Sequence, residues 1–262
     1  MYLCPMNLKF YKYQGTGNDF VMIDNRNAVF NKENTALISK LCDRNFGIGA
    51  DGIILIENDT NFDFKMVYLN ADGSETFCGN GGRCAVAFAK KLEIISNKTT
   101  FIAFDGPHVA EIENDIVALK MIDVSEIDVK QKSVFAYTGT QHHVELVDQL
   151  ENYPVFDHGK EIRNSYDAPG SNVNFAQQIG PATFRVRTYE KGVENETLAC
   201  GTGVTAVAIA MHKTGKTKSN TIYLPVEGGN LEVSFTEENG IYKNVFLKGP
   251  ATFVFHGELT IS

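Results

Sequence analysis

Two copies of one short motif constrain the fold more than any other feature of this sequence. Cys78-Gly79-Asn80-Gly81 and Cys200-Gly201-Thr202-Gly203 lie 122 residues apart in a chain of 262 residues. Each motif precedes a segment of small, apolar residues, Gly82–Leu92 in the first case and Val204–Lys213 in the second. Because a helix that is apolar on every face is buried, each motif is predicted to stand at the start of a buried helix.

Two further pairs of segments repeat in the same order along the chain. Gly15-Thr16 recurs as Gly139-Thr140, 124 residues later, and Phe64–Val67 resembles Phe184–Arg187, 120 residues later. This period is far too long for a solenoid, whose repeats span about 20 to 50 residues. The sequence therefore predicts a mixed α/β fold of two pseudo-symmetric domains, each a curved sheet or β-roll around one buried central helix.

The polar stretch 122–132 is predicted to separate the two domains. The first domain is expected to span 1–124 and the second 125–250, and the last strands, about 251–262, could return to the first domain. An amphipathic helix is predicted over Asn34–Arg44. Runs of β-branched and aromatic residues between Gly, Asn and Asp predict the following strands: Phe10–Tyr13, Phe20–Asp24, Ile53–Glu57, Phe64–Asn70, Val117–Met121, Val144–Val147, Phe184–Tyr189, Thr221–Leu224, Leu231–Phe235, Val245–Leu247 and Ala251–Phe255.

Composition and charge argue against several classes of protein. The net charge is −8 and no Lys/Arg-rich run is present, so neither nucleic acid nor an anionic membrane is an expected partner. No apolar run approaches the 18 residues of a membrane span, and the first ten residues do not resemble a secretion signal. The five cysteines include no C-x-x-C pair, which argues against a disulfide framework or a zinc site and favours a reducing cytoplasm.

The place of each motif cysteine, at the predicted start of a helix, suggests reactivity. The first N–H groups of a helix have no partner within the helix, and the helix dipole is positive there. This environment lowers the pKa of a thiol and suits a carboxylate ligand, and the glycines let a ligand approach the backbone. A lone cysteine is most often a small buried hydrophobe, and Cys84, Cys42 and Cys4 are assigned no role.

Two opposed thiols beside one carboxylate suit the inversion of the adjacent carbon atom, with one thiolate as base and one thiol as acid. A hydrolase or transferase with a single nucleophilic cysteine is an alternative, but it leaves the second motif unexplained. A non-catalytic carboxylate-binding protein is another, and it would tolerate serine at both cysteines. No nucleotide is expected because Gly15–Phe20 lacks the third glycine of G-x-G-x-x-G. No metal is expected, since His142 and His143 would point to opposite faces of a strand and no carboxylate–His cluster accompanies them.

Five segments together resemble the diaminopimelate epimerase family in order and spacing, over essentially the whole chain. They are Gly15–Phe20, Gly47–Gly52, Asn70–Glu75, Cys78–Cys84 and Glu196–Gly203. The resemblance implies a PLP-independent isomerase that interconverts LL- and meso-2,6-diaminopimelate with two cysteines, for lysine and peptidoglycan synthesis in the bacterial cytoplasm. It also implies a fold of two β-roll domains and, usually, a homodimer.

The resemblance also implies roles for individual residues. Cys78 and Cys200 would be the acid–base pair, and Gly79-Asn80 and Gly201-Thr202 would bind the reacting carboxylate through backbone amides. His142 and Glu190 would modulate the pKa of a cysteine. The other positions that match substrate-binding residues of the family are Asn18, Asn70, Asn172, Glu190 and Lys191.

Three departures from the family pattern concern recognition of the substrate. Lys191 stands where the family has arginine, Thr140-Gln141 where it has Asn-Pro or Ser-Pro, and Gly52 where some members have glutamine. Lysine keeps the charge of arginine but loses the planar fork that clasps a carboxylate. An epimerase or racemase of another amino acid on the same fold, such as histidine or a proline derivative, therefore remains an alternative.

Overall fold

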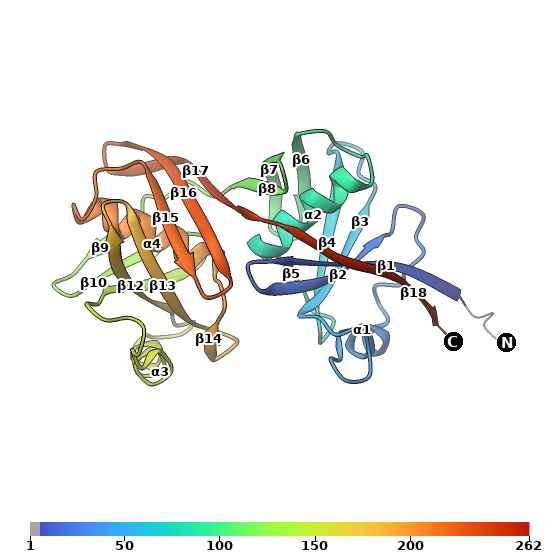
Figure 1. Ribbon diagram of the computed structural model, residues 1–262, viewed down its shortest axis with the longest axis horizontal. Helices are drawn as coiled ribbons and strands as arrows, with labels where there is room; N and C mark the ends of the chain where they lie inside the picture. The colour runs from blue at the N-terminus through green and yellow to red at the C-terminus, as the bar shows by residue number, and fades with distance from the viewer. Residues whose placement is uncertain (1–5, 262) are drawn as a thin grey trace. The chain divides into compact units, whose positions relative to one another are not determined.

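The computed structural model describes residues 6–261, which form two compact units (Figure 1). Unit 1 comprises residues 6–119 and 250–261 of this range, and unit 2 comprises residues 120–249. The C-terminal segment therefore belongs to the same unit as the N-terminal one. Among the helices of residues 6–261, none is both long enough and apolar enough to cross a membrane.

Unit 1 is built from one strongly bent sheet in the order β18-β1-β2-β3-β4-β6-β7-β8. Two neighbouring pairs are parallel, β2 with β3 across helix α1 and β4 with β6 across helix α2, and the others are antiparallel. The elements are β1 (Met6–Gly15), β2 (Asn18–Asp24), α1 (Thr35–Cys42), β3 (Gly52–Glu57), β4 (Phe64–Asn70), β5 (Glu75–Thr76), α2 (Gly79–Lys91), β6 (Lys98–Ala103), β7 (Gly106–Glu113), β8 (Ile116–Lys120) and β18 (Thr252–Ile261).

Unit 2 repeats this arrangement in the order β9-β10-β11-β12-β13-β15-β16-β17. Its parallel pairs are β11 with β12 across α3 and β13 with β15 across α4. The elements are β9 (Ile127–Val129), β10 (Ser133–Tyr137), β11 (Gln141–Leu146), α3 (Val155–Ser165), β12 (Asn172–Gly180), β13 (Thr183–Glu190), β14 (Asn195–Thr197), α4 (Gly201–Lys213), β15 (Thr221–Val226), β16 (Gly229–Glu238) and β17 (Ile241–Pro250).

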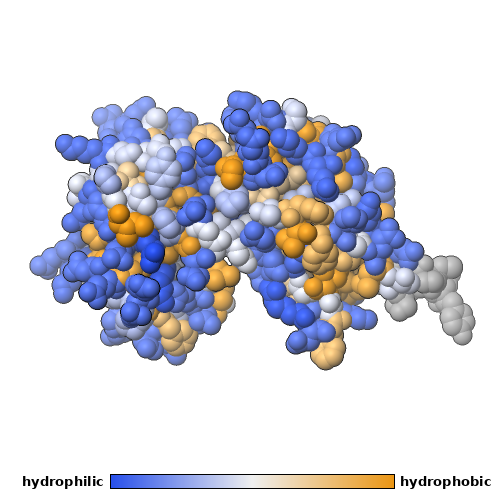
Figure 2. All heavy atoms as spheres, in the orientation of Figure 1, coloured by the Kyte–Doolittle hydropathy of each residue, from blue (hydrophilic) through white to orange (hydrophobic). Residues whose placement is uncertain are grey.

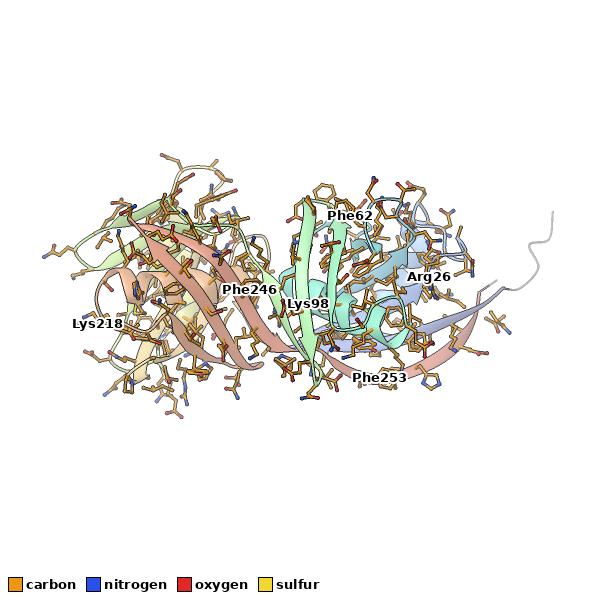
Figure 3. All side chains as sticks on the ribbon, turned by 90° about the horizontal axis from the view of Figure 1, so that it is seen from above. Arg26, Phe62, Lys98, Lys218, Phe246 and Phe253 are labelled. Carbon is orange, nitrogen blue, oxygen red and sulfur yellow. The ribbon has the colours of Figure 1, made fainter. Side chains whose placement is uncertain are left out.

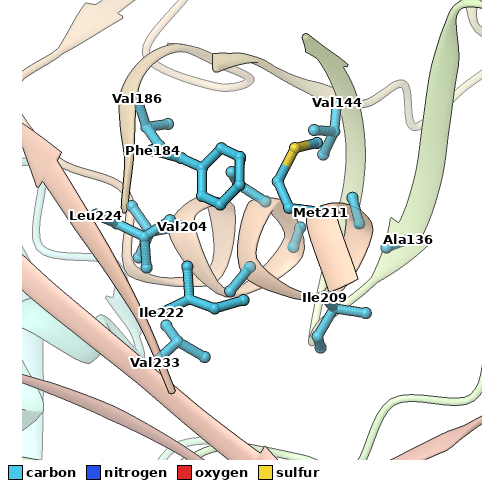
Figure 4. Packing of buried hydrophobic residues seen from close by; sticks show 14 of the residues in the cluster. Ala136, Val144, Phe184, Val186, Val204, Ile209, Met211, Ile222, Leu224 and Val233 are labelled. Atoms are coloured by element: carbon cyan, nitrogen blue, oxygen red, sulfur yellow. The ribbon is translucent and has the colours of Figure 1, made fainter. Parts of the chain in front are cut away.

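A buried helix of 13 residues lies at the centre of each unit. Residues 80–89 of α2 are all buried. Around α4, the strand side chains Phe184, Val144 and Ile222 form one buried cluster with Val204, Ile209 and Met211 of the helix, and Val144 lies beside Met211 (Figure 4). The predicted fold class, two curved sheets that each surround a central helix, is confirmed.

The strand registers refine the internal repeat. Phe20 is the parallel partner of Gly52, and His142 is the parallel partner of Asn172. When Phe64 is matched to Phe184, as the repeat predicts, these pairs align Phe20 with His142. The offset at β2 and β11 is then 122 residues, against 124 for the Gly-Thr match. The hairpins before them differ in length, because Tyr13 pairs with Phe20 whereas Ala136 pairs with His142.

Several elements carry too weak a pattern to be predicted from the sequence. Helix α3 buries only Val155 and Gly159, with Ile162 partly buried on the same face, so its apolar stripe is short. Strands β5 and β14 have two and three residues. The remaining strands absent from the prediction are β6, β7, β9, β10 and β12. Cys4, which was assigned no role, lies outside the described residues.

Candidate active site

Cys78 is the residue immediately before α2, and its backbone is extended, with φ −133° and ψ 123°. Its carbonyl oxygen accepts the N–H of Gly82 at 2.8 Å, which is the first hydrogen bond of the helix. The N–H groups of Gly79, Asn80 and Gly81 are therefore not used within the helix. Together with the helix dipole, they form an environment that favours a negative charge beside the thiol of Cys78.

The turn that begins at Gly15 packs closely against the first turns of α2. A Cβ atom on Gly15 would lie 2.9 Å from the carbonyl oxygen of Asn80 and 3.2 Å from the Sγ atom of Cys84. Real Cβ atoms essentially never come so close to backbone, so only glycine fits here. This contact explains why a glycine motif far from Cys78 in sequence lies close to it in the fold. We call the surroundings of each motif cysteine its half-site.

Asn80 and Asn18 are joined by a hydrogen bond in which Asn80 Nδ2 donates to Asn18 Oδ1. Asn18 Nδ2 in turn donates to Asp51 Oδ2 at 3.0 Å. Asn80 is buried, whereas Asn18 is half-buried. Two predicted substrate-binding residues of unit 1 therefore lie together at the start of α2.

Arg83 is a fully buried cation on α2 that sequence reasoning missed. Its Nη2 atom donates to Thr16 Oγ1 at 3.0 Å, and Nη1 has no hydrogen-bond partner within the described residues. Burial lowers the pKa of the guanidinium, and attraction to the thiols of Cys84 and Cys78 opposes that change. A buried positive charge near Cys78 favours the thiolate form of that cysteine.

Asn70 ends strand β4 and holds the short segment that leads to Cys78. Its Nδ2 atom donates to Ser74 O at 3.0 Å and to Thr76 Oγ1 at 2.9 Å. Thr76 lies in β5, two residues before Cys78. Asn70 is thus tied to the Cys78 half-site through the chain rather than placed apart from it.

Cys200 occupies the corresponding position before α4, with φ −120° and ψ 111°. Its Sγ atom lies 3.5 Å from Thr202 Oγ1, and Thr138 Oγ1 donates to the carbonyl oxygen of Thr202 at 2.9 Å. A Cβ atom on Gly203 would lie 2.4 Å from Asn174 Oδ1, which leaves room for glycine alone. The first turn of α4 is therefore held against strand β12, just as α2 is held against the Gly15 turn.

His142 is buried in unit 2 on the face of β11 that contacts Asn174. Asn174 Nδ2 lies 3.1 Å from His142 Nδ1, and no partner within the described residues contacts His142 Nε2. Burial lowers the pKa of His142 to about 3, and the nearby charge of Lys191 acts in the same direction. His142 is therefore a neutral imidazole at physiological pH. His143 points to the other face of the strand, where its ring nitrogens contact Tyr166 and Glu145.

Glu190 ends strand β13 and accepts a hydrogen bond from Thr197 Oγ1 at 2.9 Å. Burial raises the pKa of Glu190, and the bond from Thr197 partly opposes this shift. Thr197 lies in β14, three residues before Cys200. Glu190 is therefore a titratable group beside the segment that leads to Cys200.

Asn172, Lys191 and Gln141 form a connected group in unit 2. Asn172 Oδ1 accepts the backbone N–H of Lys191 at 2.8 Å, and Asn172 Nδ2 donates to Gln141 O at 3.3 Å. Lys191 Nζ lies 3.5 Å from Gln141 Oε1. Two of the positions that depart from the family pattern, Lys191 and Gln141, thus contact each other, and Asn172 bonds to the backbone of both.

The other described cysteines, Cys84 and Cys42, are buried. Burial raises the pKa of Cys84 to about 12 and that of Cys42 to about 11. Neither thiol ionises at neutral pH, which agrees with the absence of an assigned role. Among residues 6–261, no three His, Cys, Asp or Glu side chains are grouped as the ligands of a metal ion would be.

Sequence reasoning missed Asn174 and Asp51 as well as Arg83. Asn174 lies two residues after Asn172 in β12, so strand alternation places both side chains on the same face of the sheet. That alternation is a signal that could have found it. Asp51 precedes β3, and its contact with Asn18 follows from the parallel pairing of β2 and β3, which the sequence does not reveal.

Two solved structures of low sequence identity share this fold. A phenazine biosynthesis protein of the PhzF family from Bacillus anthracis superimposes with a TM-score of 0.72 and 13% identity, over 98% of this chain and 100% of that chain. A probable proline racemase from Agrobacterium radiobacter gives a TM-score of 0.68 and 15% identity, over 97% of this chain and 93% of that chain. The protein therefore shares the fold of these two structures.

Comparison of sequences narrows this class. The family model described as diaminopimelate epimerase matches residues 10–124 and 134–254. A diaminopimelate epimerase from Flavobacterium psychrophilum is 63% identical over 95% of this chain and 98% of its own length. One from Aquifex aeolicus is 40% identical over 97% of this chain and 98% of its own length. The chain belongs to the diaminopimelate epimerase family.

Proposed function

We propose that this protein interconverts LL- and meso-2,6-diaminopimelate, with Cys78 and Cys200 as the two acid–base groups. The observation that carries the proposal is the position of the two cysteines. Each one immediately precedes the central helix of its unit, and the two units have the same strand order. The membership of the chain in the diaminopimelate epimerase family supports the choice of substrate.

The proposed reaction moves one proton away from the α-carbon and returns another from the opposite side. The thiolate of one cysteine takes the α-proton, so that a C–H bond breaks and an S–H bond forms. The electron pair stays on the carbon and spreads into the adjacent carboxylate. The thiol of the other cysteine then donates its proton to the opposite face, which inverts the centre. The two cysteines exchange roles in the reverse direction, and nothing is oxidised or reduced.

Stabilisation of the carbanion is the main demand on the site, because charge builds up on the reacting carboxylate. We infer that the first backbone N–H groups of α2 and α4 supply it, at Gly79-Asn80 and Gly201-Thr202. Fixed dipoles of this kind usually contribute the largest share of such catalysis. Asn18, through its bond to Asn80, belongs to the same proposed carboxylate site.

His142 and Glu190 are proposed to adjust the protonation of the cysteines. The low pKa of His142 keeps it neutral, so it would act as a hydrogen-bond partner rather than as a charge. The pKa of Glu190 is raised towards neutral pH, and a general acid or base works best when its pKa lies near the pH of the reaction.

The distal amino-acid group of the substrate is proposed to contact Asn70, Asn172, Glu190 and Lys191. Lys191 keeps the positive charge that a second carboxylate requires. Its side chain contacts Gln141, and its backbone N–H donates to Asn172. An amino group would be suited to the carboxylate of Glu190 or the amide oxygen of Asn70. A substrate without a second amino-acid group would leave this set unused.

A homodimer and a cytoplasmic location are also proposed. Strand β18 pairs with β1 along one edge, and its side chains include the exposed residues Phe253, Val254 and Phe255. Figure 2 shows hydrophobic side chains gathered on the face of unit 1 that β1 and β18 cross, and Phe253 extends outward from β18 in Figure 3. Such a surface is typical of an interface between copies. A reducing cytoplasm would keep the two thiols active.

The test offers LL-diaminopimelate, L-histidine and L-proline separately to the wild-type protein in D₂O, without added PLP or metal and with a thiol reductant. Proton NMR measures exchange of the α-hydrogen and the appearance of the other stereoisomer. We expect exchange and the meso product with diaminopimelate alone. Turnover of histidine or proline instead would keep the two-thiol reaction but contradict the proposed substrate, and no turnover of any of them would contradict both.

A further inference from the structure

Asp51 lies directly before β3, and both oxygens of its carboxylate face hydrogen-bond donors. Oδ2 accepts from Asn18 Nδ2 at 3.0 Å and from the backbone N–H of Asp19 at 3.2 Å. Oδ1 accepts from Arg44 Nη2 at 2.8 Å. The backbone N–H of Asp51 also donates to Asp19 O at 2.9 Å. Only a group with two acceptor oxygens can satisfy every donor here.

This arrangement fixes which way the amide of Asn18 points. An amide has one acceptor end and one donor end, and the donor end of Asn18 is held by Asp51. The oxygen end must then point the other way, where it accepts from Asn80 Nδ2. If Asn18 turned over, two NH₂ groups would face each other at Asn80, and an oxygen would face the carboxylate of Asp51.

Asp51 is itself anchored by a small ionic network. Arg44 bridges Asp51 and Asp19, with a distance of 2.7 Å to Asp19 Oδ1. Lys12, which is almost fully buried, lies 2.7 Å from Asp19 Oδ2. Burial opposes the charge on Asp19, but the hydrogen bonds and charges of Arg44 and Lys12 outweigh it and lower the pKa of Asp19. Asp19 therefore remains ionised at neutral pH and keeps Arg44 in place beside Asp51.

We propose that Asp51 is a positioning residue: it sets the orientation of the Asn18 amide and, through it, of Asn80 at the start of the helix that follows Cys78. Its effect on turnover rests on the proposed function, because Asn18 and Asn80 are assigned there to the reacting carboxylate. Asp51 acts as a hydrogen-bond acceptor and not through its charge. Orientation of Asn18 requires only one oxygen of Asp51, and the other oxygen accepts from Arg44.

The experiment compares Asp51→Leu and Asp51→Asn with a matched control, Asp24→Leu. Asp24 lies at the other end of β2 and also accepts from a backbone N–H and a guanidinium, both of Arg26. We expect Asp51→Leu to raise the KM for diaminopimelate and to lower kcat/KM about tenfold, the usual effect of one lost buried hydrogen bond. Asp51→Asn can still turn its oxygen to Asn18, while Arg44 keeps Asp19, so it should stay within about twofold of wild type.

A second readout does not depend on activity. In protein labelled with ¹⁵N-asparagine, the side-chain NH₂ resonances of Asn18 should shift and exchange faster with water in Asp51→Leu, and should stay unchanged in Asp24→Leu. If Asp51→Leu fails to fold, Asp51→Ala removes the same acceptor oxygens with a smaller apolar side chain. This readout remains valid if the wild-type protein proves inactive on diaminopimelate, so failure of the proposed function and failure of this proposal can be told apart.

Three results would overturn the proposal. Unchanged Asn18 resonances in Asp51→Leu would show that Asp51 does not set the amide. Equal losses of kcat/KM in Asp51→Leu and Asp51→Asn would show that the charge matters rather than the acceptor. A lower Tm at unchanged KM, shared by Asp24→Leu, would reveal a purely structural role.

Discussion

The two units have the same strand order but place different chemistry at equivalent positions. In unit 1, Phe20 pairs with Gly52, and Gly52 pairs with Asn70. In unit 2, His142 pairs with Asn172, and Glu190 stands one residue beyond the pair formed by Tyr189 and Val173. Across the neighbouring strands, unit 1 thus places an aromatic ring, a glycine and an amide side by side. Unit 2 places an imidazole, an amide and a carboxyl group at the corresponding positions.

The central helices also differ, but here the charged side chain belongs to unit 1. Arg83 places a buried cation on α2, whereas the equivalent residue of α4 is Thr205, whose hydroxyl donates to Gly201 O at 2.9 Å. Unit 1 therefore has a fixed positive charge, and unit 2 has groups that can titrate. A duplicated scaffold can supply two similar thiols, while the residues around each thiol make the two half-sites unequal.

The largest expected effect follows from replacing either cysteine. Cys78→Ala and Cys200→Ala should each lower epimerisation of diaminopimelate about 10³-fold or more, because each removes an acid–base group. The conversion of LL- to meso-diaminopimelate followed by NMR measures the loss. Cys84→Ala is the control, since Cys84 is buried and its raised pKa of about 12 keeps it protonated. Near-normal turnover by Cys78→Ala or Cys200→Ala would contradict the proposal that each unit supplies one acid–base cysteine.

Glu190 and Asn70 provide a sharper comparison, because both end a strand and both bond a threonine before the cysteine. The pKa of Glu190 is raised by burial, so its proton is held more tightly in the folded state. The stability that this proton provides is complete below the ordinary pKa of glutamate and is lost as pH rises through the raised value. Glu190→Gln, which mimics the protonated form, should therefore raise the free energy of unfolding at pH 7 relative to wild type.

Urea unfolding of Glu190→Gln at pH 7 and at pH 4 tests this expectation. The gain should shrink at pH 4, where wild-type Glu190 is mostly protonated in both states. The kcat of Glu190→Gln should fall about tenfold at pH 7 if Glu190 takes part in proton transfer. Asn70→Ala is the comparison from unit 1 and should show no such dependence on pH. A gain in stability that is equal at both pH values would show that burial of the charge is not its cause.

The smallest effect concerns His142, whose counterpart Phe20 cannot titrate. The pKa of His142 is lowered to about 3 by burial, so the unfolded chain binds a proton near pH 6.5 and the folded protein does not. Its contribution to stability is complete above pH 6.5 and is lost as pH falls toward 3. His142→Asn should cost about 1 kcal/mol at pH 7, through the contact with Asn174, and should lose less stability than wild type down to pH 4.

NMR of the histidine rings provides the direct check on His142. One resonance, absent from His142→Asn, should keep a constant chemical shift between pH 5 and 8. A resonance of His142 that titrates near pH 6.5 would mean that the imidazole is not shielded from water. In that case the difference between His142 and Phe20 would concern shape alone.

The sequence predicts the part of the fold that rests on strong patterns. The central helices are apolar all round, and the Cys-Gly-x-Gly motif recurs before each of them, so the repeat could be recognised without a structure. Helix α3 escaped prediction because it buries only Val155 and Gly159. The matched segments give an offset of 124 residues at the Gly-Thr turn and 120 at β4 and β13, and the hairpins before β2 and β11 differ in length.

The site was predicted only as far as the motifs reach. Asn18, Asn80 and Asn172 could be chosen because they stand in recognisable segments. Asp51 and Arg83 act through contacts between residues 33 and 67 positions apart. Such contacts depend on parallel pairing across a helix and on the packing of a turn against α2. Neither leaves a local pattern in the sequence, so these residues required the structure.

The most direct test of the two-thiol reaction is α-hydrogen exchange in D₂O by Cys78→Ala and Cys200→Ala, with LL- and meso-diaminopimelate offered separately. Each variant keeps one thiol, which can remove a proton from one face only and return a deuteron to that face. We predict that one variant exchanges the α-hydrogen of LL-diaminopimelate, that the other exchanges that of the D-centre of the meso form, and that neither converts one into the other. Exchange of the same stereoisomer by both variants, or conversion by either, would contradict the assignment of one cysteine to each face.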